Sequence, residues 1–280
     1  MSARMIRNLL NIPVYIFLAI GAAIIIFPMY LTIVTAFKTP HEVALNFFAP
    51  PTSVYLENFE YILSRSQFYV YLKNSVVVTV VSVSLIAVIT PMLSYAIARN
   101  MAQSKFYKGA YYYILLAIFV PFQVVMVPLT LLLARTSLLS IPGLILCYLS
   151  FSMAQSVFLY TGYIKSVPLE LEESSCIDGC SVFQTFFYIV YPLIVPMTAT
   201  IIILNSLWIW NDFLLPLLVL NRSPSIWTMP LFMFNFKNQY QFDATIAFAA
   251  FLLALLPIML LYAFMQRYII AGLTTGALKG

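Results

Sequence analysis

The stretch "NSVVVTVVSVSLIAVITPMLSYAIA", Asn74–Ala98, contains no charged side chain in the 25 residues between Lys73 and Arg99. A helix needs about 20 mostly apolar residues to cross the hydrocarbon layer of a membrane. This stretch exceeds that length. It therefore predicts a membrane-spanning helix.

Five further windows of the chain are long enough for a span and carry no charge. Charged residues are 8% of the chain and hydrophobic residues 63%, whereas about 25% of an average soluble domain is charged. The sequence therefore predicts an all-α membrane protein with one transmembrane domain over residues 1–280. The first window is too long for the apolar part of a signal peptide, so we expect it to be retained. The six predicted spans are residues 12–36, 74–98, 109–134, 143–164, 187–210 and 245–266.

An even number of spans puts both ends of the chain on one side of the membrane. That side would carry eight basic residues: Arg4, Arg7, Arg99, Lys105, Lys108, Lys165, Arg267 and Lys279. The opposite side would carry six: Lys38, Arg65, Lys73, Arg135, Arg222 and Lys237. Because short cytoplasmic loops are rich in Lys and Arg, we expect both termini, including the tail 267–280, to be cytoplasmic.

Two connections on the opposite side are long, at residues 38–73 and 212–244. Both are rich in Phe and Tyr, so we expect packed caps or docking surfaces rather than disordered loops. Within the first, apolar residues recur at helical spacing over residues 54–63, which predicts a short interfacial helix.

Prolines interrupt most of the predicted spans, and each leaves a backbone carbonyl without its helical partner. They are Pro28, Pro91, Pro121, Pro128, Pro192, Pro196 and Pro257. Two interpretations stay open. The kinks belong either to a closely packed static bundle or to a bundle that opens and closes.

Motifs and residue types that the sequence lacks exclude several classes of function. It has no phosphate-binding GxxxxGK[ST] loop and no Asp, Glu, Lys, Arg or His inside the six spans. Proton-coupled carriers usually need an ionisable residue within the membrane. The single histidine, His41, and the cysteines Cys147, Cys176 and Cys180 do not form a metal-ligand pattern. We therefore expect no catalytic, cofactor or metal site, and energy for uphill transport would come from another subunit.

The connection between the fourth and fifth spans contains "ELEESSCIDG", Glu170–Gly179, with four of the nine carboxylates. Pro168 and the glutamates suit the first turn of a helix, where the helix dipole favours negative charge. Gly179 allows a tight turn, and an apolar helical pattern resumes at Val182. The sequence predicts a helix–turn–helix over residues 168–186. Its charge fits both a solvated loop and a surface for a basic partner.

The spacing in this loop resembles a signature of permease subunits of binding-protein-dependent ABC importers, of the carbohydrate-uptake type. That signature reads Glu-Ala-Ala, three residues, Gly, nine residues, Ile, one residue, Leu-Pro. The corresponding positions here are Glu173, Ser174, Ser175, Gly179, Ile189, Tyr191 and Pro192. Serines replace both alanines, and tyrosine replaces leucine. "WNDFLLPLLVL" (Trp210–Leu220) and "QRYIIAGLTTGALKG" (Gln266–Gly280) also resemble that family, so the resemblance covers essentially the whole chain.

The resemblance implies six spans with a cytoplasmic coupling helix between spans four and five, in the cytoplasmic (inner) membrane of a prokaryote. It implies a second permease, two ABC ATPase subunits that hold ATP and Mg²⁺, an extracytoplasmic solute-binding protein that meets residues 212–244, and a carbohydrate substrate. Nucleic acid is not an expected partner, and the tail would reach towards the ATPase pair. The implied ATPase-coupling residues are Glu170, Glu173, Ser174, Ser175, Ile177, Asp178 and Gly179.

Aromatic and uncharged polar side chains suit sugar binding, and those in or near the spans could line a substrate path. They are Asn74, Gln123, Gln155, Asn205, Trp208 and Asn211, together with Asp212. Helix–helix hydrogen bonding is the commoner role of such residues, and the partner permease could hold the substrate contacts instead. Alternative functions are a secondary transporter, an ABC permease for a non-sugar solute such as a glycerol-phosphate ester, and a structural membrane subunit.

Overall fold

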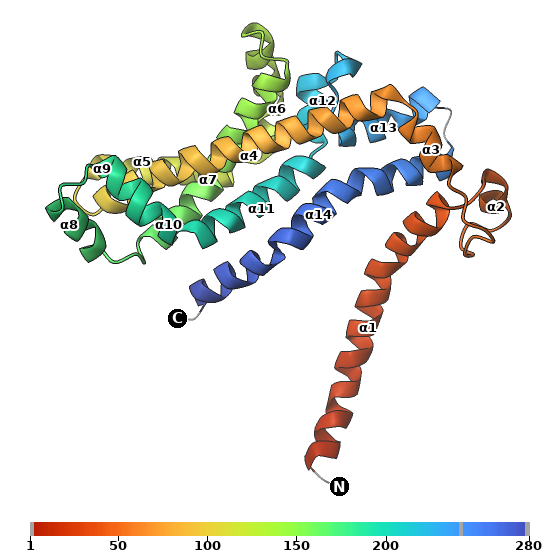
Figure 1. Ribbon diagram of the computed structural model, residues 1–280, viewed down its shortest axis with the longest axis horizontal. Helices are drawn as coiled ribbons and strands as arrows, with labels where there is room; N and C mark the ends of the chain where they lie inside the picture. The colour runs from red at the N-terminus through yellow and green to blue at the C-terminus, as the bar shows by residue number, and fades with distance from the viewer. Residues whose placement is uncertain (1–2, 241–242, 278–280) are drawn as a thin grey trace. The chain divides into compact units, whose positions relative to one another are not determined.

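The computed structural model describes residues 3–240 and 243–277, and all regular elements of these residues are helices (Figure 1). The described part of the chain is therefore all-α, as its sequence predicts. The predicted tail, residues 267–280, is helical up to Ala277 because it continues helix α14 (Ala244–Ala277). Residues 278–280 of that tail lie outside the described residues.

The helices group into two compact units. Unit 1 comprises Met1–Tyr69 and Met233–Leu256, and unit 2 comprises Val70–Phe232 and Pro257–Gly280. Unit 2 contains most of α4 (Ser66–Asn100) and the elements that follow it in the chain. These are α5 (Lys105–Leu116), η1 (Ala117–Phe119), α6 (Phe122–Arg135), α7 (Ile141–Ile164), α8 (Glu170–Ile177), α9 (Val182–Gln184), the π-helix η2 (Thr185–Val190), α10 (Tyr191–Leu193), α11 (Val195–Asn211), α12 (Leu214–Leu220), η3 (Pro224–Ile226) and the start of α13 (Met229–Tyr240).

Helix α4 buries one face and exposes the other within unit 2. Buried residues recur every three or four positions, as one helical face requires. They are Val78, Ser82, Ile86, Thr90, Ser94 and Ile97. Val80 and Val88 lie on the opposite face and are more than half exposed. Because the exposed face is apolar, it suits contact with lipid or with another membrane subunit.

Among the described residues, four helices are individually long and apolar enough to cross a membrane. They are Pro13–Ala36, Ser66–Asn100, Ile141–Ile164 and Ala244–Phe264. These match the predicted spans 12–36, 74–98, 143–164 and 245–266. Over the residues that the structure describes, the number of spans rises to six if each of two bent helix pairs is one crossing.

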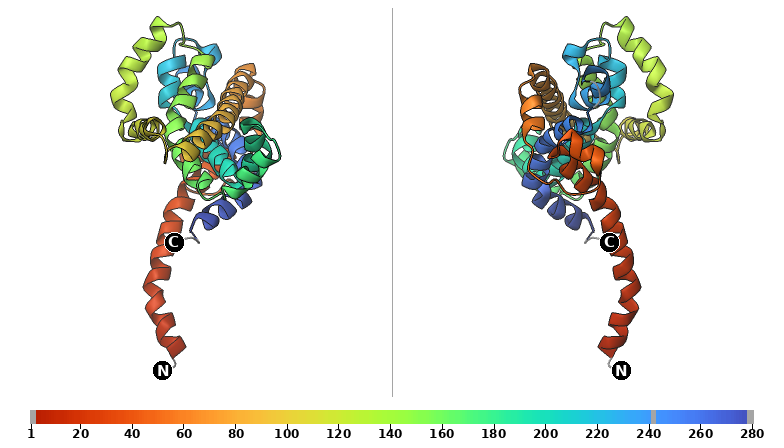
Figure 2. Two further views of the ribbon diagram at one scale, coloured as in Figure 1. Left: turned by 90° about the vertical axis from the view of Figure 1, so that its left-hand side faces the viewer. Right: turned by 90° about the vertical axis from the view of Figure 1, so that its right-hand side faces the viewer.

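The predicted span 109–134 is one of these bent pairs. Residues Lys105–Phe119 meet α6 at an angle of 103°. The N-cap residue of α6 is Pro121, in an extended conformation, and proline cannot donate the backbone hydrogen bond that would continue the helix. α6 contacts α12, but Leu133 is its one buried residue, and most of the helix is uncovered (Figure 2).

The predicted span 187–210 is the second bent pair. Residues Val182–Leu193 meet α11 at 75°, and Pro196 occupies the first turn of α11. The π-helix η2 precedes the bend. Since π-helical segments are rare and often occur at functional sites, the whole segment after the acidic loop departs from a regular span.

Pro91 lies inside α4 and does not break it. A proline at this position leaves the Ala87 carbonyl, four residues earlier, without its helical N–H donor. The Tyr191 hydroxyl of α10 donates a hydrogen bond to that carbonyl oxygen at 3.4 Å. A neighbouring helix therefore satisfies the group that the proline frees.

Unit 1 begins with α1 (Ala3–Ala36), followed by α2 (Pro40–Leu45) and α3 (Glu57–Leu63). α3 is the predicted short helix of residues 54–63, although it begins at Glu57. The side chains of α1 from residue 13 to residue 29 are largely exposed, although the Phe27 ring stacks on that of Phe48, whereas Val34, Thr35 and Ala36 in its last turn are buried.

The connection that follows α1 is packed, as its aromatic content predicts. The Lys38 side chain is 1% exposed, and its ammonium group donates to the carbonyl oxygens of Asn46 at 2.9 Å and Phe47 at 3.2 Å. The Asn58 carboxamide donates to the carbonyl oxygens of Ala36 and Lys38. These bonds fix the connection onto the end of α1 and the start of α3.

Glu42 forms a capping box at the start of α2. Its carboxylate accepts the Thr39 N–H, and the Glu42 N–H donates to the Thr39 hydroxyl. The other carboxylate oxygen accepts the Thr52 hydroxyl and the Thr52 N–H, the latter at 2.9 Å. The Thr52 hydroxyl, followed by the backbone N–H groups, lowers the pKa of Glu42 to about 2.

Candidate functional site

The acidic loop of unit 2, for which the sequence predicts a helix–turn–helix over residues 168–186, folds as α8, a turn and α9. Glu170, Glu172 and Glu173 lie in the first turn of α8, where the unsatisfied N–H groups favour negative charge. The helix begins two residues after Pro168, with Leu169 as N-cap. α9 then continues directly into η2.

Gly179 makes the turn between α8 and α9. Its φ of 84° is in the left-handed region, which residues with a Cβ atom rarely adopt. The Gly179 N–H donates to the Cys176 carbonyl at 3.1 Å, and the Cys180 N–H donates to the Ser175 carbonyl at 3.0 Å. This pair of bonds is a Schellman motif, which satisfies the last carbonyls of the helix.

A capping box starts the second helix. The Ser181 N–H donates to Gln184 Oε1 at 2.8 Å, and the Gln184 N–H donates to Ser181 Oγ at 3.4 Å. Backbone bonds at one end of the turn and side-chain bonds at the other therefore fix the loop, which makes it a defined structure rather than a flexible acidic segment.

Glu172 points into unit 2 and makes a buried ion pair with the last turn of α4. Arg99 Nε and Nη2 lie 2.8 Å and 2.5 Å from Glu172 Oε1. The Tyr95 hydroxyl donates to Oε2 at 2.8 Å, and Arg99 Nη2 also donates to the Val167 carbonyl at 3.0 Å. The side chains of Arg99 and Glu172 are 16% and 8% exposed. We call these four residues the Arg99–Glu172 latch.

Ser175 also faces inward. Its hydroxyl lies 2.8 Å from the Thr185 hydroxyl at the start of η2 and 2.8 Å from the Glu172 carbonyl. Phe186 packs beside these residues, with its ring centroid 5.2 Å from that of Tyr95. Of the predicted coupling residues, Ser175 is thus the one that the structure turns towards the helix bundle.

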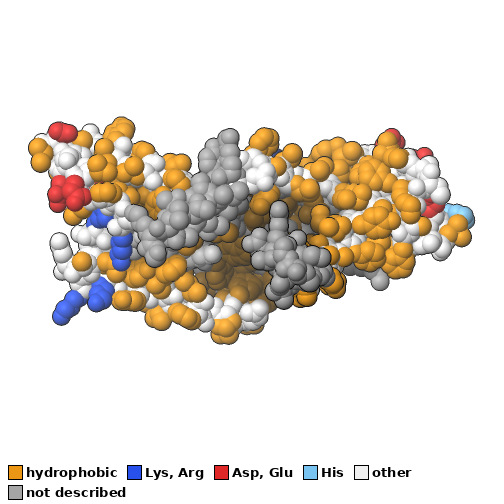
Figure 3. Space-filling model, turned by 90° about the horizontal axis from the view of Figure 1, so that it is seen from below, with side chains coloured by type: hydrophobic (Ala, Val, Ile, Leu, Met, Phe, Trp, Pro, Cys, Tyr) orange, Lys and Arg blue, Asp and Glu red, His pale blue; other side chains and the backbone are white. Residues whose placement is uncertain are grey.

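The other predicted coupling residues share an outward-facing surface. They are Glu170, Glu173, Ser174, Ile177, Asp178 and Gly179, all exposed. Ile177 is 87% exposed, and Val182 and Phe183 on α9 are about two-thirds exposed. Figure 3 shows acidic and basic side chains gathered at the end of unit 2 that carries α8. This surface combines three carboxylates with protruding apolar side chains, which suits a protein partner rather than water alone.

Sequence reasoning missed the latch. In the sequence, Arg99 stands out only as a basic residue at the end of a predicted span. Glu172 stands out only as one member of an acidic run. Nothing in the spacing of the sequence pairs two residues that lie 73 positions apart.

The predicted substrate-path residues occupy several separate places. Asn74 donates to the carbonyl oxygens of Ser225 and Trp227, so it caps the η3 turn. Asn205 and Asn211 donate to carbonyl oxygens one turn earlier in α11. The remaining polar candidates of the spans, Gln123 on α6 and Gln155 on α7, are exposed.

Trp208 and Asp212 do come together, through a residue that the sequence did not single out. The Tyr148 hydroxyl donates to Asp212 Oδ2 at 3.0 Å, and the Tyr148 ring meets the Trp208 ring edge-on at 5.4 Å. Asp212 Oδ1 accepts the Leu214 N–H at 3.1 Å. Burial raises the pKa of the Asp212 carboxyl, while these hydrogen bonds act in the opposite direction. The carboxyl group thereby joins α7 to the end of α11 and the start of α12.

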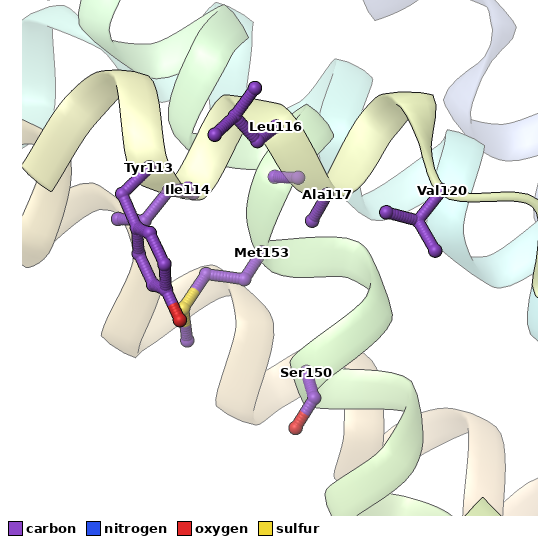
Figure 4. Close-up of a pocket in the computed structure, with 8 residues that line it drawn as sticks. Tyr113, Ile114, Leu116, Ala117, Val120, Ser150 and Met153 are labelled. Carbon is purple, nitrogen blue, oxygen red and sulfur yellow. The ribbon is translucent and has the colours of Figure 1, made fainter. Parts of the chain in front are cut away.

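A groove of about 340 Å³ lies between α5, η1 and α7 (Figure 4). Its lining is apolar apart from the hydroxyls of Tyr113 and Ser150, and the Tyr113 ring lies beside Met153. Gln123 and Gln155 are not among the described residues that line it. Among the described residues, no group of three His, Cys, Asp or Glu side chains is arranged to hold a metal ion.

Comparison with known proteins gives a family match and related permeases. Residues 90–275 match the family model described as "Binding-protein-dependent transport system inner membrane component". The multiple sugar-binding transport system permease protein MsmG of Streptococcus mutans is 41% identical over 95% of this chain and 96% of its own length. A probable starch degradation products transport system permease protein, AmyC of Thermoanaerobacterium thermosulfurigenes, is 35% identical over 90% of this chain and 91% of its own.

The fold is also similar to a solved structure. A chain of a bacterial ABC transporter involved in the import of the acidic polysaccharide alginate aligns with a TM-score of 0.81. The alignment covers 96% of this chain and 99% of the other, at 20% identity. At that identity the similarity concerns the fold.

Proposed function

This chain belongs to the family of binding-protein-dependent transport system inner membrane components, and from that membership we propose that it is one permease subunit of an ATP-driven importer for a sugar or oligosaccharide. Several similar permeases have names that specify sugars or starch products. The chain itself is a transport component and not an enzyme, so ATP hydrolysis belongs to a separate subunit.

One observation carries the proposed attachment to that ATPase: α8 is rigidly built and yet exposes a charged and apolar face. A Schellman turn, a capping box and the latch fix the backbone of the loop. The outward side chains of Glu173 and Ile177 make no contribution to that internal support. A structured but uncovered helix of this kind fits a groove on a cytoplasmic partner, and α8 is then the coupling helix.

The proposed complex holds a second permease, two ATPase subunits that bind ATP and Mg²⁺, and an extracytoplasmic solute-binding protein. In this assembly each bent helix pair counts as one crossing, which gives six spans with both termini in the cytoplasm. The latch supports this topology because it joins the end of α4, the end of α7 and α8 at one end of unit 2. Lys105, Lys108 and Lys165 are exposed near these segments, as cytoplasmic basic residues would be.

Trp208 is the substrate-path residue with the clearest support. Its ring is 41% exposed and rests against Tyr148, which Asp212 holds in place. An exposed aromatic ring can stack on the C–H face of a sugar. Tyr148 and Asp212 would then orient the ring rather than bind the sugar, since their polar groups are already hydrogen-bonded to one another.

Co-purification and uptake test the proposed function. The tagged chain is expressed with the ATPase, permease and solute-binding protein encoded beside it. It is then purified in detergent and reconstituted into liposomes. We expect the ATPase to be retained, and radiolabelled maltotriose or raffinose to be taken up only with ATP inside. Retention of no ATPase by a folded chain would contradict the proposal, and uptake driven by a proton gradient without ATP would favour a secondary transporter.

A further inference from the structure

The attachment of α8 to the rest of unit 2 has an unusual feature: its strongest bonds reach a helix that is distant in the chain. α8 follows α7 directly, but the Glu172 carboxylate is bonded at both oxygens by α4. Arg99 occupies Oε1 and Tyr95 occupies Oε2. Figure 1 shows α8 beside the same end of unit 2 at which α4 ends.

We propose that the Arg99–Glu172 latch makes α8 and the last turns of α4 one rigid body, so that movement of α8 by its partner is passed directly to α4. Arg99 is then a positioning residue. This inference rests on the proposed function, because it assumes that a partner moves α8.

The geometry of the latch suits the transmission of movement. The guanidinium group contacts Glu172 through two nitrogens, which fixes direction as well as distance. Both side chains are largely buried, so water does not replace either partner cheaply when the pair separates. Arg99 also binds the Val167 carbonyl in the segment between α7 and α8. One side chain therefore holds α4, this segment and α8 together.

A second set of contacts ties α4 to the segment after α8. The Tyr191 hydroxyl donates to the Ala87 carbonyl, about three turns before Arg99 on α4. The rings of Tyr95 and Phe186 pack at 5.2 Å. α4 is thus attached to the loop both before and after its turn, which a single surface ion pair would not achieve.

The latch and the outward face of α8 do not overlap. Glu172 and Ser175 lie three residues apart and face inward, whereas Glu173 and Ile177 lie four apart and face outward. An Arg99 variant therefore leaves the proposed docking surface intact. Loss of partner binding by α8 and loss of movement passed from α8 to α4 can therefore be measured separately.

The first test uses the complete complex in liposomes, with Arg99→Gln, Arg99→Lys and the control Lys105→Gln. Lys105 is exposed at the same end of unit 2, so its variant removes the same charge without touching the latch. Phosphate release from ATP is measured with and without the solute-binding protein. We expect Arg99→Gln to retain the ATPase while losing roughly tenfold of the stimulated rate. Arg99→Lys keeps the charge without the planar fork, so its stimulated rate should lie between those of Arg99→Gln and the unchanged protein. Lys105→Gln should have the rate of the unchanged protein.

The second test measures the rigid connection itself. Spin labels are attached at Asn100→Cys and at the native Cys176 of α8, both exposed, in a chain whose Cys147 and Cys180 are replaced by alanine. With Arg99 present, we expect the distance between labels to stay the same when ATP is added to the complex. With Arg99→Gln, the distribution should broaden and shift on ATP addition. If Arg99→Gln fails to assemble, Arg99→Lys provides the same comparison.

Two results would overturn the inference. One is full stimulation of ATP hydrolysis in Arg99→Gln. The other is an unchanged label distance in that variant, even if hydrolysis falls, because the latch would then act by another route. Failure of the unchanged chain to retain an ATPase would instead contradict the proposed function.

Discussion

Neighbouring glutamates of α8 have opposite surroundings. Glu172 is buried and bonded by Arg99 and Tyr95, whereas Glu173 is exposed. A helix turns by about 100° per residue, so adjacent side chains face different directions. Consecutive residues of the acidic run therefore have different roles: Glu172 bonds within unit 2, and Glu173 is available to a partner.

Reversal of the outward charge should weaken partner binding without unfolding the loop. Glu173→Lys reverses the charge that α8 presents to the proposed partner's groove, and if basic side chains line that groove, the like charges suppress association strongly. We expect the recovery of the ATPase with the tagged chain to fall roughly tenfold, with normal amounts of the chain in the membrane. Glu60→Lys on α3 makes the same charge change on the opposite predicted side, and normal recovery is expected. Equal recovery from both variants would contradict the docking role of Glu173.

Whether a substitution at Gly179 is tolerated should depend on whether the new residue can adopt the positive φ, and not on the size of its side chain. A Cβ atom there would meet nothing within 4 Å, but φ is positive. Gly179→Asn should retain coupled ATP hydrolysis, because Asn adopts the left-handed conformation readily. Gly179→Pro should abolish the coupling, since it fixes φ near about −65° and removes the N–H that binds Cys176. Equal hydrolysis by the two variants would show that the turn is not required.

The sequence predicts which segment forms the site better than it predicts the role of each residue. Pro168, the glutamates and Gly179 predict a helix followed by a turn, and the structure has α8 and the left-handed Gly179 at these positions. These residues do not indicate that Ser175 faces Thr185 or that Glu172 faces Arg99. Those contacts depend on how α4 packs against the loop, which no local pattern records.

At the scale of single elements, Pro91 and Tyr191 offer a test of how a membrane helix accommodates proline. Tyr191→Phe removes the hydroxyl that binds the Ala87 carbonyl, and we expect a loss of about 0.5–1.5 kcal/mol in unfolding free energy. In a Pro91→Ala background the backbone N–H gained at that position can bind the same carbonyl, so Tyr191→Phe should then cost almost nothing. Unfolding in mixed detergent micelles gives both values. Equal losses in the two backgrounds would mean that the hydroxyl acts elsewhere.

The capping box of α2 should respond to acid only below the usual range for glutamate. The pKa of Glu42 is lowered from 4.5 to about 2, so its stabilising effect is complete above the ordinary value and is lost as the pH falls towards the lowered one. Protection of the Thr52 amide from hydrogen exchange, corrected for the intrinsic rate, should fall across that window. Glu42→Gln should show weaker protection with no such dependence. A loss of protection centred above about pH 5, higher than the ordinary range of a glutamate, would contradict this assignment.

At the scale of elements, the sequence pattern does not predict which prolines bend a helix. Seven prolines interrupt the predicted spans, yet Pro91 lies in a continuous helix and Pro121 lies at a bend of 103°. The Tyr191 hydroxyl satisfies the carbonyl freed by Pro91, while Pro121 is the extended N-cap residue of α6. A proline in a predicted span therefore does not by itself predict a bend.

At the scale of the whole molecule, the charge distribution predicts which loops face the cytoplasm. A single cysteine placed at Ile177, in a chain without native cysteines, should react with a membrane-impermeant maleimide only when the cytoplasmic side is accessible. A cysteine at Ser53, exposed in the connection after α2, should react only from outside. Labelling of both from the same side would contradict the six-span topology and leave a topology in which a bent pair does not cross.

The π-helical geometry of η2 has a consequence for how relatives of this chain can differ. A π-turn holds about one residue more than an α-turn, so η2 is equivalent to a one-residue insertion between the loop and α11. Deleting one residue from Thr185–Val190 would restore a regular α-turn, and the residues after it would keep their orientation. The same deletion inside a regular α-helix would rotate everything after it by about 100°. Asp212 should therefore stay beside Tyr148 after a deletion within η2, and relatives can differ by one residue in this segment without a change of architecture.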